Sequence, residues 1–257
     1  MTKDFAGWFD SPLGKLVLAR ETEQLLRSSR RFHGDTLLWL GPVNVEGLSL
    51  DRCMVRHRIF GSLRSEALQS STGNDFAAHA SVYLGEPDSL PFPNSSIDAL
   101  VLHHALESVN DPRAAIREVG RVLRPGGCLV FCGINPFSLF GLRCLLARWR
   151  SSSFSELHPV SPLRLLDWLA VLGFELDEAV QYLMFRAPLD NNGGEYPKWQ
   201  PIAERLENWR FPLGGIYMVM ARKAVVGMTE VGSGRKISVP GGLQTVPMPR
   251  PSTRQGS

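Results

Sequence analysis

Residues 85–131 constrain the fold most, because they place a strand, a helix and a second strand in one short stretch. Residues 99–102 form an unbroken apolar run bounded by polar residues, which is typical of a strand buried on both faces of a parallel sheet. Asp111 and Pro112 predict a helix start, since Asp can cap a helix and Pro fits its first position. A second apolar run at residues 128–132 predicts the next strand. Together they indicate a right-handed βαβ unit of an open α/β sheet, a fold that binds ligands at its strand ends.

Several short motifs follow one another in this stretch in a fixed order. They are Glu86, Leu90-Pro91-Phe92, Ile97-Asp98, His104-x-x-Glu107, Asp111-Pro112 and Leu123-Arg124-Pro125-Gly126-Gly127. In this order they resemble the central part of class I S-adenosylmethionine-dependent methyltransferases of the type 11 group. The resemblance is strong over residues 85–131 and looser over residues 32–222. It implies a Rossmann-like α/β sheet of about seven strands with helices on both faces, transferase (methylation) activity and S-adenosyl-L-methionine as the cofactor.

The chain divides into three parts by composition. Residues 1–31 are expected to form an N-terminal helical segment, and residues 32–226 the methyltransferase-like domain. Residues 227–257 are rich in Gly, Pro, Ser and Thr, with four basic residues against one acidic residue, so this basic tail is expected to be disordered. Further helices are expected at residues 13–31, 137–150, 161–173 and 201–209, and further strands at residues 36–40, 55–60, 81–84, 174–182 and 216–221.

The turn after the first predicted strand departs from the family pattern, which is Asp/Glu-x-Gly-x-Gly-x-Gly. Trp39 stands where the acid is usual, only Gly41 is kept, and Pro42 and Val43 add bulk and remove one N–H. The Gly-x-Gly-x-x-Gly pattern of nicotinamide-binding proteins is absent as well. Two interpretations of Gly41 stay open, a contact with the adenosyl group and a simple strand-ending glycine.

Three further residues are candidates for cofactor binding at the strand ends. Glu66 is the only acid near the end of the second strand, where an acid would bind ribose hydroxyls; its alternative is a solvated helix residue. Glu86 follows the third strand, where the resemblance implies a contact with the adenine amino group; its alternative is a surface-loop residue. Leu90, with Phe92, would pack around adenine or cover the edge of the core.

Two histidines, His103 and His104, lie at the predicted carboxyl end of the fourth strand and are the catalytic candidates. Methyl transfer requires mainly alignment and exclusion of water, and a base helps when the acceptor must lose a proton. A neutral histidine suits that role. We expect His103 to face the methyl group and also to contact the cofactor, whereas His104 and Glu107 have a structural alternative as a locally bonded pair.

Charge and cysteine content argue against other classes of protein. The chain has a net charge of +3, and the tail accounts for it, so the remainder lacks the basic excess of a nucleic-acid-binding domain. Four scattered cysteines without further ligands at metal-binding spacing predict buried free thiols and no metal site, which suits a reducing cytoplasm. No apolar run is long enough for a membrane span, and the first residues lack a signal-peptide pattern.

The segment after the strand at residues 128–132 has two interpretations. Residues 135–138 can form a loop that closes over an acceptor, with Phe137 and Phe140 lining an apolar pocket. The predicted helix at residues 137–150 is amphipathic and basic, so it either packs on its own domain or contacts anionic lipid. Packing on the domain is the favoured interpretation.

These features predict a cytoplasmic enzyme that transfers a methyl group from S-adenosyl-L-methionine to an unidentified small or apolar acceptor. The expected partner is that small molecule, with no nucleic acid, and the sequence leaves the oligomeric state unspecified. The alternative is a noncatalytic protein that keeps the methyltransferase fold as a binding or scaffold module. The degenerate glycine loop and the missing ribose acid favour this alternative, whereas the other motifs indicate only the fold.

Overall fold

The computed structural model describes residues 5–9, 11–41, 53–62, 80–147, 157–183 and 214–225. Residues 1–226 form one compact unit and residues 227–257 a second. The second unit, the predicted helix at residues 201–209 and the turn after Gly41 lie outside the described residues. The tail therefore remains a prediction, and the following description concerns the first unit.

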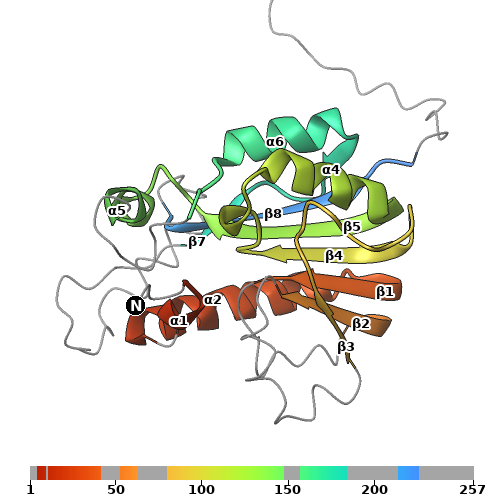
Figure 1. Cartoon of the computed structure of the whole chain (residues 1–257), viewed down its shortest axis with the longest axis horizontal. Coiled ribbons are helices and arrows are strands. Elements are labelled where there is room, and N and C mark those ends of the chain that lie inside the picture. Colours follow the sequence, from red (N-terminus) through yellow and green to blue (C-terminus); the bar gives the residue numbers. More distant parts are fainter. Residues whose placement is uncertain are drawn as a thin grey trace, which may run out of the picture. The chain divides into compact units, whose positions relative to one another are not determined.

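A single mixed sheet organises this unit (Figure 1). Its strands lie in the order β3-β2-β1-β4-β5-β8-β6, and β7 also pairs with β8. The pairs from β3 to β5 are parallel, whereas β8 runs antiparallel to β5, β6 and β7. The strands are β1 (His33–Leu40), β2 (Met54–Ser62), β3 (Ala80–Leu84), β4 (Ile97–His103), β5 (Leu123–Ile134), β6 (Phe174–Leu176), β7 (Gln181–Leu183) and β8 (Ile216–Lys223).

Helices cover both faces of the sheet, as the sequence predicts (Figure 1). Alternate residues of a strand point to opposite faces, so Leu37 of β1 packs with the helix α2, and Leu38 packs on the side of α4 and α6. The helices are α1 (Phe5–Trp8), α2 (Pro12–Ser29), the 3-10 turn η3 (Leu106–Ser108), α4 (Pro112–Val122), α5 (Leu139–Ala147) and α6 (Pro162–Val171). The predicted Rossmann-like fold with about seven strands is confirmed.

The helix starts follow the signals in the sequence. The Asp111 carboxylate accepts hydrogen bonds from the backbone N–H groups of Arg113 and Ala114, at 2.9 and 3.0 Å, and Pro112 opens α4. The Ser11 hydroxyl accepts the Gly14 N–H at 3.0 Å in the same way at the start of α2. These caps satisfy N–H groups that a helix leaves unpaired in its first turn.

The strand predicted at residues 174–182 is divided in two. β6 ends at Leu176 and β7 begins at Gln181, with an acidic segment between them. Asp177 in this segment binds the guanidinium of Arg222 at 2.9 Å, and acidic residues have low strand propensity. The Asp177 N–H still donates to the Met220 carbonyl of β8 at 3.0 Å, so the strand is interrupted only after this residue, where the apolar pattern alone predicted continuity.

The cysteine prediction is confirmed. Cys53, Cys128, Cys132 and Cys144 are all free and buried. Burial raises the pKa of the Cys128 thiol and of the Cys132 thiol to about 12, so both stay protonated at neutral pH. In the described part of the chain, no helix is long and apolar enough to cross a bilayer.

Candidate active site at the carboxyl end of β4

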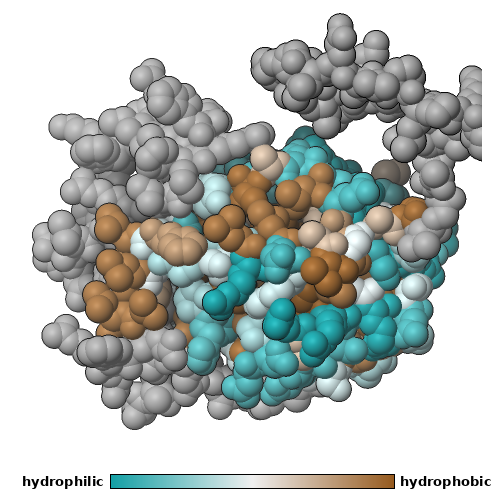
Figure 2. All heavy atoms as spheres, turned by 90° about the horizontal axis from the view of Figure 1, so that it is seen from above, coloured by the Kyte–Doolittle hydropathy of each residue, from teal (hydrophilic) through white to brown (hydrophobic). Residues whose placement is uncertain are grey.

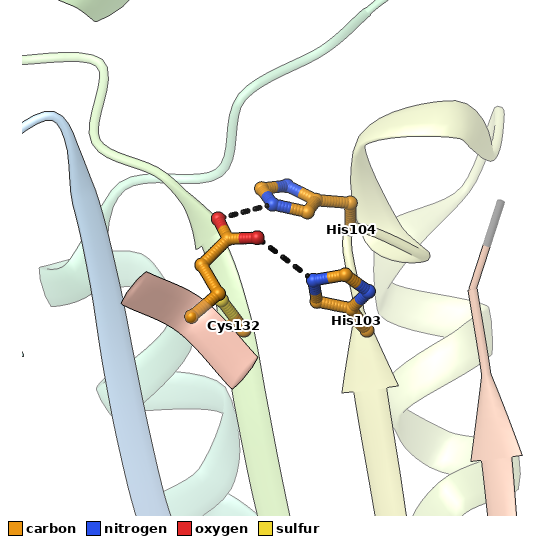
Figure 3. A group of neighbouring side chains, drawn as sticks. His103, His104 and Cys132 are labelled. Carbon is orange, nitrogen blue, oxygen red and sulfur yellow. Dashed lines mark hydrogen bonds and ion pairs between the residues drawn. The ribbon is translucent and has the colours of Figure 1, made fainter. Parts of the chain in front are cut away.

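A buried carboxylate and two buried imidazoles meet where β4 ends (Figure 3). Glu21 of α2 accepts a hydrogen bond from Nε2 of His103 at 3.0 Å through one oxygen, and from Nε2 of His104 at 2.8 Å through the other. Glu21 reaches this position because it lies one helical turn from both Val17 and Leu25, on the face of α2 that packs against the sheet. The helix thus carries a carboxylate within its apolar face, directed at the end of β4.

The two histidines differ in protonation. Burial lowers the pKa of His103, and its bond to Glu21 does not offset this, so His103 is neutral. Burial also acts to lower the pKa of His104, but the Glu21 charge, with hydrogen bonds to neighbouring groups, raises it well above the usual value. Burial acts to raise the pKa of Glu21, yet the His104 charge and the bonds from both histidines lower it to about 2. The cluster therefore holds a Glu21–His104 ion pair beside a neutral His103.

Glu107 anchors His104 from the other side. One Glu107 carboxylate oxygen accepts the Ile134 N–H at 2.7 Å and lies 3.5 Å from Nδ1 of His104. His104 also has a backbone φ of +52°, a left-handed conformation that costs energy in a residue other than glycine. The local pairing of His104 with Glu107 that the sequence suggested is present, and the surrounding contacts hold the strained backbone in place.

The cluster also has the composition of a metal site. Glu21, His103, His104 and Cys132 each offer one ligand atom, and these atoms lie within 4.8 Å of one another. Such a ligand set suits Zn²⁺. In this structure each Glu21 oxygen accepts a hydrogen bond from Nε2 of one histidine. A cation bound here would replace these two hydrogen bonds, and the expected absence of a metal site remains a prediction.

Several buried polar atoms at this end of the sheet form no hydrogen bond among the described residues. They include the indole Nε1 of Trp39 and Nδ1 of His103, whose rings lie 5.8 Å apart. Figure 3 shows that the second nitrogen of His103 lies on the side of the ring opposite the bonded carboxylate. Buried polar atoms normally form hydrogen bonds. An N–H donor and a nitrogen acceptor that lie close together without partners could therefore bind a polar ligand.

Gly41 and His103, two of the predicted cofactor residues, are brought together. The Gly41 N–H donates to the Gly61 carbonyl at 3.2 Å, and a Cβ added at Gly41 would lie 2.6 Å from the His103 carbonyl oxygen. Close packing of β1 against the end of β4 therefore explains why this position is glycine. This packing is a structural explanation for a glycine at position 41, and the contact between Gly41 and the adenosyl group remains a prediction.

The other predicted cofactor residues lie elsewhere or outside the described chain. Glu86 is exposed in the turn after β3, where its carbonyl accepts the Ser89 N–H at 3.2 Å. Leu90 is buried in the core on the α4 side, and its N–H donates to Glu118 at 3.1 Å. Glu66 lies outside the described residues. The cofactor roles of these three residues remain predictions.

Sequence reasoning missed Glu21. The histidines were found because they directly follow a buried strand, but Glu21 lies in a helix rich in polar residues. Its spacing of four from Val17 and Leu25 was the available signal, and it becomes informative only when the buried face of α2 is known.

Comparison with known proteins gives three kinds of likeness. The family model described as a methyltransferase domain matches residues 53–131. The uncharacterized protein YafS of Escherichia coli K12 is 30% identical over 223 residues, covering 86% of this chain and 82% of YafS. An S-adenosylmethionine-dependent methyltransferase from Mesorhizobium loti superposes with a TM-score of 0.57 at 20% identity, covering 80% of this chain and 100% of the other. The [4+2]-cyclase SpnF gives a TM-score of 0.57 at 19% identity and covers 80% of each chain.

Proposed function

Because this chain belongs to the class I S-adenosylmethionine-dependent methyltransferases, we propose that it methylates a small or apolar acceptor, with His103 as the general base. One observation carries this proposal. His103 is fully buried and neutral, one of its nitrogens is held by Glu21, and the other has no partner among the described residues. This is the arrangement of an oriented base.

The proposed base depends on the tautomer of His103. The Glu21 carboxylate only accepts hydrogen bonds, so Nε2 of His103 carries the proton and Nδ1 keeps its lone pair. Nδ1 can then take a proton from a hydroxyl, amine or activated carbon of the acceptor. Burial excludes water from this step and keeps the imidazole neutral beforehand.

His104 has a different role in this proposal. It is a buried cation bonded to Glu21 and beside Glu107, so it acts as a positioning residue. Its charge keeps Glu21 ionised, and Glu21 in turn orients His103. His104 would not itself exchange a proton with the acceptor.

S-adenosylmethionine, when bound, supplies an electrophilic methyl group. We propose that Gly41, Glu66, Glu86, Leu90 and His103 hold it, and the unpaired indole N–H of Trp39 adds a buried donor at the same end of the sheet. The unpaired Nε1 of Trp39 and Nδ1 of His103 fit a polar ligand. A cytoplasmic location belongs to the same proposal and is supported by the four free thiols.

The first test measures cofactor binding and turnover separately. Calorimetry with S-adenosylmethionine and S-adenosylhomocysteine should show binding by the wild type and weaker binding by His103→Gln, which loses one cofactor contact, so turnover is compared at saturating cofactor. S-adenosylhomocysteine release with a panel of small alcohols, phenols and amines should fall by at least about 100-fold in His103→Gln. His33→Gln, an exposed histidine at the start of β1, is the control and should behave as the wild type. Equal turnover in His103→Gln would remove the proposed base.

The second candidate function is a noncatalytic module with this fold. Trp39 in place of the usual acid favours it, and the fold neighbour SpnF is a [4+2]-cyclase, so the fold alone does not fix function. The variant Pro42→Gly/Val43→Gly separates the candidates. In an enzyme adapted to its bulky turn, the change should be neutral or harmful to cofactor binding. No binding by the wild type, with a clear gain in the variant, would establish the noncatalytic function.

A further inference from the structure

A cleft of about 390 Å³ opens on the side of the sheet that carries α4 and α6. The first turn of α4, the helices α5 and α6, and the segment at residues 158–160 line it. Its apolar wall includes Leu145, Val160 and Trp168. Its volume lies in the range of small-molecule sites, which are mostly apolar with a few polar groups.

Two arginines supply the charge of this cleft. The Arg113 guanidinium lies 5.7 Å from the centre of the Trp168 ring, and Arg164 lines the same space. Neither guanidinium has a carboxylate partner among the described residues. The acid in the lining, Asp111, caps α4 through one oxygen and lies 3.9 Å from Arg117 through the other. The cleft therefore has an excess of positive charge.

Elsewhere in the described part of the chain, arginines commonly pair with acids. Arg20, Arg27, Arg31, Arg117, Arg121, Arg124 and Arg222 each form an ion pair. Arg113 and Arg164 also lie in the first turns of their helices, where the helix dipole disfavours a cation. The presence of Arg113 and Arg164 at one cleft is therefore not explained by ion pairs or by a contribution to helix stability.

The cleft is connected to the buried histidines through a short path. The N–H of His158, which lines the cleft, donates to the Glu107 carbonyl at 2.8 Å. The Glu107 carboxylate in turn contacts His104. Pro136, also in the lining, directly follows the buried Asn135 at the end of β5. The cleft thus lies beside the segments that follow β4 and β5, but His103 does not line it. The reacting group of an acceptor held here would have to extend past the end of β4 to meet Nδ1 of His103.

Apolar side chains extend from the cleft along α5. Phe137, Leu139, Leu142, Leu145 and Leu146 are between 48% and 86% exposed. Figure 2 shows apolar side chains gathered at the α5 end of the molecule, on the left of the view. Leu145 belongs both to this group and to the cleft, so an apolar surface leads away from the two arginines.

We propose that this cleft binds the methyl acceptor, and that Arg113 and Arg164 hold an anionic group of that acceptor, a carboxylate or a phosphate. This inference rests on the proposed methyltransferase function. The planar guanidinium matches both anions with two parallel hydrogen bonds. Leu145, Val160 and Trp168 cover the apolar part of the acceptor, so its class is a small amphiphilic anion.

Binding of three eight-carbon probes to the full chain tests the proposal. Octanoate and octyl phosphate carry the two anionic groups, and 1-octanol carries the same apolar chain without charge. We expect at least one anion to bind at least tenfold more tightly than 1-octanol in calorimetry at fixed ionic strength. The anion that binds more tightly identifies the group on the acceptor.

Matched variants separate the cleft from general surface charge. Arg113→Gln/Arg164→Gln should weaken binding of the anion at least tenfold and leave 1-octanol unchanged. Arg27→Gln/Arg31→Gln removes the same charge from arginines that pair with Glu23 and Glu178, which do not line the cleft, and should stay within twofold of the wild type. An equal loss in the control, or equal affinity for 1-octanol and both anions, would overturn the anion site.

Cofactor binding is measured in the same samples. S-adenosylmethionine binding without any anion preference overturns the anion site and leaves the methyltransferase proposal standing. Anion binding that depends on the two arginines, in a protein that binds no S-adenosylmethionine, overturns the acceptor role and the methyltransferase proposal but keeps the anion site. Displacement of the anion by S-adenosylmethionine would place both ligands in one site and refute a separate cleft.

Discussion

Replacing Glu21 by Gln should destabilise the protein strongly, although the side chain keeps its shape. Glu21 is fully buried, and its pKa falls from 4.5 to about 2 in the folded protein. That shift corresponds to roughly 3 kcal/mol, which agrees with the ~3–5 kcal/mol cost of removing one partner from a buried ion pair. For a domain of this size, roughly 3 kcal/mol lowers the melting temperature by about 6–12 °C.

The matched control lies two residues further along the same helix. Glu23 is half-exposed and pairs with Arg27 at 2.6 Å on the surface of α2. Glu23→Gln removes the same charge, so its cost should stay below about 1 kcal/mol. Urea unfolding followed by circular dichroism at pH about 6.5, at one ionic strength, measures both variants. Equal midpoints for Glu21→Gln and Glu23→Gln would refute the buried ion pair with His104.

Three further predictions concern packing, pH and the tail. Gly41→Ala should lose about 1–3 kcal/mol of stability in the same unfolding assay, because its Cβ would lie 2.6 Å from the His103 carbonyl oxygen. Gly7→Ala is the control and should be neutral, because the space around Gly7 is open. Because the pKa of His104 is raised on folding, its contribution to stability is complete below about pH 6.5 and is lost as pH rises. Because the pKa values of His103 and Glu21 are lowered on folding, their contributions are lost as pH falls, below about pH 6.5 for His103 and below about pH 4.5 for Glu21. Melting temperature should therefore peak near pH 6.5, and a steady rise to pH 9 would contradict this assignment of charges. Deletion of residues 227–257 should change the melting temperature by less than about 1 °C, because the tail has little apolar surface to bury, and a drop of several degrees would show that it docks.

The sequence predicted the fold well because the signals for its central unit are local. The apolar run of β4, the Asp111 cap and the turn before residues 128–132 each specify one element, and together they specify a parallel sheet. The division of the strand at residues 174–182 was not predicted, because it depends on how each half pairs with β8, which is distant in sequence. Local patterns do not report such long-range pairs.

The candidate site was predicted only in part, for a similar reason. His103 and His104 could be found from their place after a buried strand, but the protonation of each depends on Glu21, which lies 82 residues before His103. Gly41 was identified as a conformational signal, yet its close neighbour is the backbone of β4 rather than a ligand. Which groups face one another across the sheet emerges only from the packing of α2.

The position of β8 has a consequence for synthesis of the protein. β8 lies between β5 and β6 and also pairs with β7, although it follows all of them in the chain. While Ile216–Lys223 is still inside the ribosome, the emerging nascent chain has an unpaired β5 edge that includes Val130 and Phe131. An open apolar strand edge pairs readily with other chains. The interval between translation of β5 and release of β8 is therefore the period in which this protein is most exposed to aggregation and most dependent on chaperones.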